Sequence, residues 1–143
     1  MILSPAPASA PAGERFTGIF VITEYLSKYA VAYPIRRKAA AEIAPLLFRY
    51  ISEFGAPQEI LSDRGSEFTN ELVDGMLSNL GVSHRITSAY HPRTNGLAER
   101  TNATLVELLR RLADVEHPDT WPQYLDVALL ARPTAPACTA QLE

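Results

Sequence analysis

The sequence predicts a single α/β domain. Short apolar runs with strand character alternate with longer stretches of helical periodicity. A length of 143 residues with 47% hydrophobic content is sufficient for one hydrophobic core. Polar, glycine-containing breaks separate the segments, as at Gly55 and Gly65. We therefore expect strands and helices that share one core.

The first part of the chain is predicted to contain two strands and a helix. Its Ala/Pro-rich opening, residues 1–13, is expected to form a short extended piece and a loop, followed by strands near 16–23 and 28–33. Apolar residues at helical spacing predict a helix over about 40–53 that stops at Gly55. Pro45 lies inside this pattern, so the helix should begin late or kink.

The rest of the chain continues the alternation and ends in helices. The predicted elements are a strand over 59–62, a helix over 67–80, a strand at 82–86, a long helix from 96 to about 113 and a helix over 121–131. In the long helix, one face is formed by Thr101, Leu105, Leu108 and Leu112, and the opposite face by Glu99, Asn102, Val106 and Arg110.

Two carboxylates stand in local sequences suited to presenting them. Asp63 comes where an apolar strand ends at a polar turn, and Glu99 falls in the first turn of a helix after a loop rich in turn formers. Either residue alone would more often be an ordinary surface charge. Together they predict a metal site, and hard oxygen ligands favour Mg²⁺ or Mn²⁺. Paired metals of this kind activate a water or hydroxyl toward a phosphodiester.

The segments around these carboxylates resemble the catalytic core of retroviral and long-terminal-repeat retrotransposon integrases, most closely the Ty3/gypsy branch. The resemblance rests on residues 60–68, with Ser62-Asp63-Arg64-Gly65, and on residues 87–102. Supporting similarity lies in residues 25–30, 54–57 and 121–125.

The resemblance implies a ribonuclease-H-like fold, with a five-stranded mixed sheet flanked by helices. In this family an Asp, Asp, Glu triad binds two metals and joins the 3′ end of element DNA to target DNA. Asp63 and Glu99 match the second and third members, whereas Met1 occupies the position of the first Asp. A thioether does not replace a bridging carboxylate for Mg²⁺. We therefore expect a weak metal site and impaired catalysis; Glu24, at the end of a strand, is not a metal ligand in the family.

The same alignment affects the predicted domain limits. Residues 1–13 would hold a truncated first strand and a loop, and residues 14–143 the integrase catalytic core. In the family that first strand is central, and beginning at Met1 removes about half of it. Each backbone group buried without a ladder partner would cost about 1–3 kcal/mol.

The net charge and the distribution of charge lead to different expectations about nucleic-acid binding. A net charge of −3 argues against a nucleic-acid binder. Between residues 84 and 111, however, five arginines face two glutamates. We expect DNA contacts from Arg64, Tyr90, His91, Arg93, Asn95, Arg100 and Asn102. The alternative for each arginine is a solvated surface residue with a partner four positions away.

Other features bear on compartment and partners. Cys138 is the single cysteine, which excludes an intramolecular disulfide and fits a reducing compartment. The histidines are scattered, so we expect no His-His-Cys-Cys zinc module. With no membrane-spanning run or signal peptide in sight, we expect a soluble intracellular protein, nuclear if it acts on chromosomal DNA. The resemblance also implies a homo-oligomer.

Three functions remain open at this point. The first is an integrase core homologue that binds DNA and performs metal-dependent strand transfer, impaired by Met1. The second is a non-catalytic DNA-binding or protein-interaction domain derived from an integrase. The third, a ribonuclease H, is disfavoured because residues 91–96 and the following helix resemble integrases.

Overall fold

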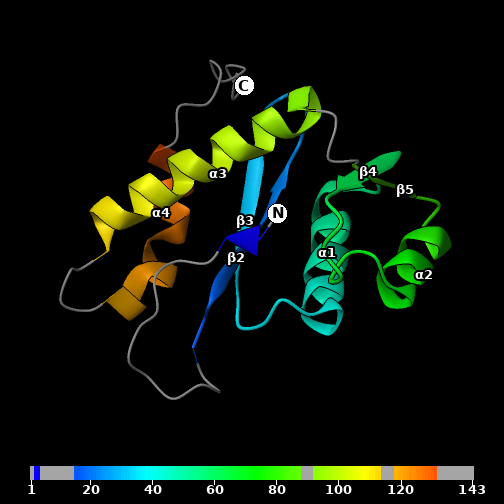
Figure 1. Ribbon diagram of the computed structural model, residues 1–143, viewed down its shortest axis with the longest axis horizontal. Helices are drawn as coiled ribbons and strands as arrows, with labels where there is room; N and C mark the ends of the chain where they lie inside the picture. Colours follow the sequence, from blue (N-terminus) through cyan, green and yellow to red (C-terminus); the bar gives the residue numbers. More distant parts are fainter. Residues whose placement is uncertain (1, 4–14, 88–91, 114–117, 132–143) are drawn as a thin grey trace, which may run out of the picture.

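A computed structural model describes residues 2–3, 15–87, 92–113 and 118–131 (Figure 1). Its strands are β1 (Ile2–Leu3), β2 (Gly18–Thr23), β3 (Ala30–Ile35), β4 (Glu59–Ser62) and β5 (Ser83–Ile86). Its helices are α1 (Ala40–Phe54), α2 (Glu71–Asn79), α3 (Pro92–Leu112), the 3₁₀ helix η1 (Pro118–Tyr124) and α4 (Leu125–Ala131). Within these residues, no helix combines the length and hydropathy needed to cross a lipid bilayer.

The five strands form two sheets. β2 pairs antiparallel with β3 along its whole length and with β1 at two positions, where Ile2 faces Phe20 and Leu3 faces Ile19. β4 and β5 form a separate parallel pair. The strand number and mixed pairing are as expected, but the described strands are divided between two sheets. The two described residues of β1 pair with β2 at Ile19 and Phe20.

Two hydrophobic cores lie on opposite faces of the three-stranded sheet, with α1 and α2 on one side and α3 and α4 on the other (Figure 1). Side chains alternate along β2, so Phe20 enters the first core while Ile19 and Val21 enter the second. The first core contains Phe20, Ile35, Ile43, Ala44, Leu47, Ile51, Phe68, Val73, Leu77 and Val82. The second contains Ile19, Val21, Ala30, Ala32, Leu105, Leu109, Trp121, Leu125 and Ala128.

Helix α1 begins and ends where the sequence predicts. It starts at Ala40 and runs through Pro45, so of the two expected effects of this proline the late start does not occur. At the other end Gly55 adopts φ 91°, a value that side chains rarely allow, and its N–H donates to the Ile51 carbonyl at 2.8 Å. Gly55 therefore ends the helix as predicted.

Capping explains the other shifted boundaries. The predicted start of α2 at residue 67 was wrong, because the Asn70 side chain accepts from the Val73 N–H at 3.0 Å and sets the helix start at Glu71. α3 begins at Pro92 rather than 96, where a proline in the first turn leaves no helical hydrogen bond unmade. The predicted last helix is divided into η1, which contains Pro122, and α4.

Candidate functional site

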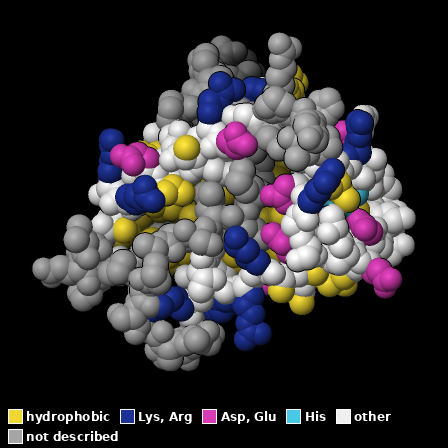
Figure 2. Space-filling model, in the orientation of Figure 1, with side chains coloured by type: hydrophobic (Ala, Val, Ile, Leu, Met, Phe, Trp, Pro, Cys, Tyr) yellow, Lys and Arg dark blue, Asp and Glu magenta, His cyan; other side chains and the backbone are white. Residues whose placement is uncertain are grey.

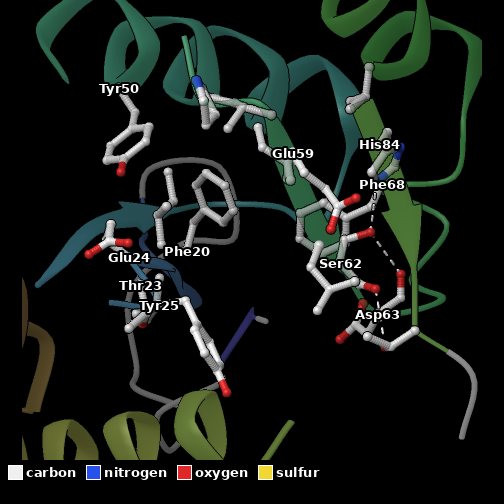
Figure 3. Close-up of a pocket in the computed structure, with 18 of the residues that line it drawn as sticks. Phe20, Thr23, Glu24, Tyr25, Tyr50, Glu59, Ser62, Asp63, Phe68 and His84 are labelled. Atoms are coloured by element: carbon white, nitrogen blue, oxygen red, sulfur yellow. Dashed lines mark hydrogen bonds between the residues drawn. The ribbon is translucent and has the colours of Figure 1, made fainter. Parts of the chain in front are cut away.

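A cavity of about 740 Å³ lies between the two sheets (Figure 3). Its walls come from β2, from β4 and the turn after it, from the helices α1 and α2, and from α3. Asp63 and Glu99, the two predicted metal ligands, both line this cavity although they are distant in the sequence. The two residues that the sequence singled out therefore border the same cavity.

Asp63 follows directly after β4 and is half buried. Its Oδ1 accepts the Gly65 N–H at 3.0 Å, which closes a tight turn of the Asx type. A Cβ at Gly65 would lie 2.6 Å from Cδ of Glu67, so the turn requires glycine while the Glu67 side chain keeps its position. The turn fixes the orientation of the Asp63 carboxylate at the cavity wall.

A hydrogen-bonded chain supports the strand end that carries Asp63. Nε2 of His84 lies 2.8 Å from Oγ of Ser62, and Nδ1 of His84 lies 2.6 Å from Oδ1 of Asp74 (Figure 3 draws the Ser62 contact). The Asp74 carboxylate accepts from Nδ1 of His84, while the Ser62 hydroxyl, which also donates to the Asp63 carbonyl at 3.1 Å, contacts Nε2. The chain ties β4, β5 and α2 together. Sequence reasoning missed it, since its members lie on three separate elements and carry no local motif.

Glu99 and Asn102 lie one turn apart on α3, and both line the cavity. Glu99 is exposed, as its predicted helix face requires. Asn102 was placed on the same exposed face, and this was wrong: its side chain is 3% exposed. This part of α3 borders the cavity between the two sheets, and helical periodicity carries no information about such a contact. Both amide atoms of Asn102 lack a hydrogen-bond partner within the described residues.

The remaining residues of α3 follow the predicted apolar face closely. Thr101, Leu105 and Leu109 are buried, while Leu108 and Leu112 pack partly buried against the second core. The apolar face of α3 thus packs against the second core, and Glu99 projects from the opposite face.

The cavity offers two oxygen donors suited to a hard divalent cation, Asp63 and Glu99. Among the described residues there is no group of three or more His, Cys, Asp or Glu side chains that could hold a metal. Met1, aligned with the first catalytic Asp, lies outside the described part. The side chains present therefore fit a divalent ion only as an incomplete ligand set.

Glu24 also borders the cavity, but its carboxylate is engaged by the turn after β2. Hydrogen bonds from the Ser27 side chain and from the N–H groups of Leu26 and Ser27 lower the pKa of Glu24 to about 2. The Leu26 N–H lies 2.8 Å from Oε1. The turn residues 26 and 27 therefore hold the Glu24 carboxylate.

The predicted DNA-contacting residues are distributed unevenly. Arg64 and Arg100 are exposed, whereas Asn102 is buried in the cavity wall. Arg93 and Asn95 belong to α3, but their side chains are not described, and Tyr90 and His91 lie outside the described residues.

Two other arginines of this region have acidic partners at the surface. Nη1 of Arg85 lies 3.4 Å from Glu59, and Nη2 of Arg111 lies 2.9 Å from Glu107, four residues earlier in α3. On the face shown in Figure 2, Lys and Arg side chains are dispersed among acidic ones rather than gathered in one patch. The surface-arginine alternative therefore describes Arg111, whereas Arg85 pairs with Glu59 of the neighbouring strand.

The sequence matches the family described as "Integrase core domain" over residues 8–92, which includes Asp63 and ends before Glu99. The chain belongs to this integrase core family. The match spans more than half of the 143 residues.

Relatives and solved structures agree with this assignment. This integrase core is 30% identical over 119 residues to the Transposon Tf2-3 and Tf2-4 polyproteins of Schizosaccharomyces pombe. The alignments cover 82% of the chain and 9% of each polyprotein. The expected similarity to the Ty3/gypsy branch is confirmed.

The fold is similar to solved retroviral integrases. The catalytic core domain of BIV integrase superposes with a TM-score of 0.70 at 23% identity, over 82% of this chain and 78% of that one. A chain of the simian T-cell lymphotropic virus intasome in complex with PP2A regulatory subunit B56 gamma gives a TM-score of 0.65 at 24% identity, over 78% and 40%. The expected ribonuclease-H-like fold is confirmed.

Proposed function

We propose that this chain is a DNA-binding integrase core that retains two of the three metal-binding carboxylates and is impaired in strand transfer. The observation that carries the proposal is that Asp63 and Glu99 line one cavity in a chain of the integrase core family. The chain spans about a tenth of the length of the curated relatives that it matches. Strand transfer, DNA substrates and partners are therefore proposals for this chain.

Asp63 and Glu99 would hold Mg²⁺ or Mn²⁺. A bound ion would supply charge stabilisation at a phosphodiester undergoing in-line displacement. The turn between Asp63 and Gly65 orients the first carboxylate, and the rigid α3 presents the second. The position of Met1 in the alignment leaves the set one carboxylate short, so we expect weak binding and little turnover.

DNA contact would come from the residues around the cavity mouth. Arg64 follows Asp63 and Arg100 follows Glu99 in the sequence, and both are exposed, which suits contacts with phosphates. We also propose Tyr90, His91, Arg93 and Asn95 as DNA contacts, from the resemblance alone. The buried Asn102 is not proposed as a contact to duplex DNA.

Manganese binding tests the site directly. Titration of Mn²⁺ followed by electron paramagnetic resonance should show one weak site in the parent chain, lost in Asp63→Asn and in Glu99→Gln. The matched controls are Asp126→Asn and Glu107→Gln, which remove exposed carboxylates from α4 and from α3 away from the cavity. Equal Mn²⁺ binding by all four variants would contradict the site.

Strand transfer of a labelled oligonucleotide duplex tests the impairment. We expect little product from the parent and more from Met1→Asp placed behind an added initiator methionine. Efficient transfer by the parent would show that the proposed impairment is wrong.

The non-catalytic alternative makes a different prediction. In this alternative the chain binds DNA or a protein without performing strand transfer. In that case DNA affinity would be unchanged in Asp63→Asn, and Met1→Asp would not restore transfer. Sedimentation analysis of the chain with and without DNA tests the proposed homo-oligomer.

A further inference from the structure

Three successive cations, Arg36, Arg37 and Lys38, occupy the loop between β3 and α1, and all three are exposed. Between Glu24 and Glu42 the chain carries four Lys or Arg residues and no acidic residue. The three side chains of the loop form no ion pair within the described residues, unlike the surface arginines of β5 and α3. Although most cations of the chain are dispersed, this group, here called the cationic loop, concentrates positive charge in one place.

The carboxylate that follows the cationic loop binds its backbone rather than its side chains. Oε1 of Glu42 accepts the N–H of Arg36 at 2.6 Å, and Oε2 accepts the N–H of Arg37 at 2.7 Å. The Thr17 hydroxyl donates to the Arg36 carbonyl at 2.6 Å. These bonds restrain the loop backbone, and three cations against one carboxylate leave a local charge of +2. The cationic loop is therefore both positively charged and held in place.

One of the three side chains is also oriented by an aromatic ring. The guanidinium carbon of Arg36 lies 4.5 Å from the ring centroid of Phe16. This cation–π contact restrains the side chain without an oxygen acceptor, so its N–H groups stay available to a ligand. A guanidinium that is held in this way loses less conformational entropy when it binds a phosphate.

The cationic loop lies at the opposite end of the three-stranded sheet from the candidate metal site. Ile35, the last residue of β3, pairs with Gly18 at the start of β2, whereas Thr23 at the end of β2 lines the cavity. The intervening strand is about 17–20 Å long. In Figure 1 the connection from β3 to α1 lies at the foot of the view and the beginning of α3 at the top. The loop is therefore a surface distinct from the cavity mouth.

The exposure of the cationic loop restricts the kind of anion that it would bind. Side chains that project from an exposed loop do not enclose a ligand, so a single small anion would stay hydrated beside them. A polyanion is favoured instead, because several phosphates are contacted at once and their counterions are released. Among polyanions, DNA is favoured because the chain belongs to the integrase core family and is proposed above to bind DNA.

We propose that the cationic loop is a second contact surface for the phosphate backbone of duplex DNA, separate from Arg64 and Arg100 at the cavity mouth. The inference rests on the proposed DNA binding and adds to it the place of a further contact. Contacts to phosphates position a duplex without reading its sequence, so binding through the loop is independent of base sequence and of metal.

The salt dependence of DNA binding tests the loop. The probe is a fluorescently labelled duplex, and anisotropy measures its affinity for the full chain over a series of KCl concentrations in the presence of a chelator. The variant Arg37→Gln/Lys38→Gln should bind at least about tenfold more weakly, and the slope of log K against log[KCl] should become shallower by about two. The conservative variant Arg37→Lys/Lys38→Arg should restore both values.

The matched control is Arg49→Gln/Arg111→Gln. It removes the same charge from two exposed arginines, each of which is paired with a glutamate four residues away. We expect its affinity and slope to stay close to those of the parent. Because the exchanged side chains of both variants are exposed, thermal melts should show the same midpoint as the parent.

Three outcomes would overturn the inference. Equal weakening in the control would show that net charge alone accounts for the effect. Weakening by Arg64→Gln/Arg100→Gln but not by Arg37→Gln/Lys38→Gln would contradict the cationic loop and leave the proposed DNA binding in place, whereas no binding by the parent would contradict both. If Arg37→Gln/Lys38→Gln reduced binding to phosphatidylserine vesicles and left DNA binding unchanged, the loop would be assigned to a lipid surface instead.

Discussion

His84 on β5 and Ser62 on β4 are joined by a contact of 2.8 Å between Nε2 and Oγ, one residue before Asp63. The same imidazole contacts Asp74 of α2, so one buried side chain connects three elements of the first half of the fold. The position of the candidate ligand Asp63 therefore depends on a residue outside the proposed pair of ligands.

Replacing His84 by Ala should destabilise the fold by about 1–3 kcal/mol, because two hydrogen bonds of a buried side chain, to Ser62 and to Asp74, are lost. Urea unfolding followed by circular dichroism measures the change. Arg85→Ala is the control: its ion pair with Glu59 is 3.4 Å long and exposed, so the cost should stay below about 1 kcal/mol. An equal decrease in the free energy of unfolding in both variants would contradict a larger contribution from the His84 contacts.

Replacing Asn102 by Leu should stabilise the free chain by about 1–2 kcal/mol. The substitution removes two buried amide atoms that lack partners and places an apolar side chain of similar size beside the cavity. A thermal melt would show the gain as a rise in midpoint. A fall in the midpoint would mean that the amide has a partner in solution.

Glu24 should make stability depend on pH. Its pKa in the folded chain is about 2, below the ordinary value of 4.5, because the turn donates hydrogen bonds to the ionised carboxylate. The stabilisation is therefore present above pH 4.5 and is lost as the pH falls toward 2. The difference in urea midpoint between the parent and Glu24→Gln should be largest near pH 6 and shrink below pH 4. A difference independent of pH would contradict this account.

Two glycines should respond in opposite directions to alanine. At Gly75, inside α2, a new Cβ meets no atom within 4 Å, so Gly75→Ala should stabilise by about 0.5–1 kcal/mol. Gly55 also has open space but adopts φ 91°, so Gly55→Ala should destabilise by about 1–3 kcal/mol. Each is the control for the other in one set of thermal melts. A gain at both sites would contradict the backbone argument.

Local signals predicted most of the elements. Helix α1 could be predicted because its apolar spacing and the stop at Gly55 are properties of neighbouring residues. That Asp63 and Glu99 border the same cavity could be predicted because the family resemblance supplied the fold. Helix starts were less reliable, since the Asn70 cap competes with an apolar pattern that extends before it.

Features that depend on long-range packing could not be predicted. The burial of Asn102 results from the way α3 covers the gap between two sheets, and helical periodicity alone places it on the solvent side. The contacts of His84 join residues 10 and 22 positions away. No spacing in the sequence distinguishes this histidine from a solvated one.

The two cores described above divide the candidate metal site between them. Asp63 follows β4 and belongs to the part of the fold that surrounds the first core, with α1 and α2. Glu99 lies on α3, which packs against the second core. The distance between the carboxylates is thus a property of how the halves dock, and a small rotation of one half changes it without altering any helix or strand. Affinity for a divalent ion would therefore depend on how the two cores pack against each other, and a mutation in either core could change it.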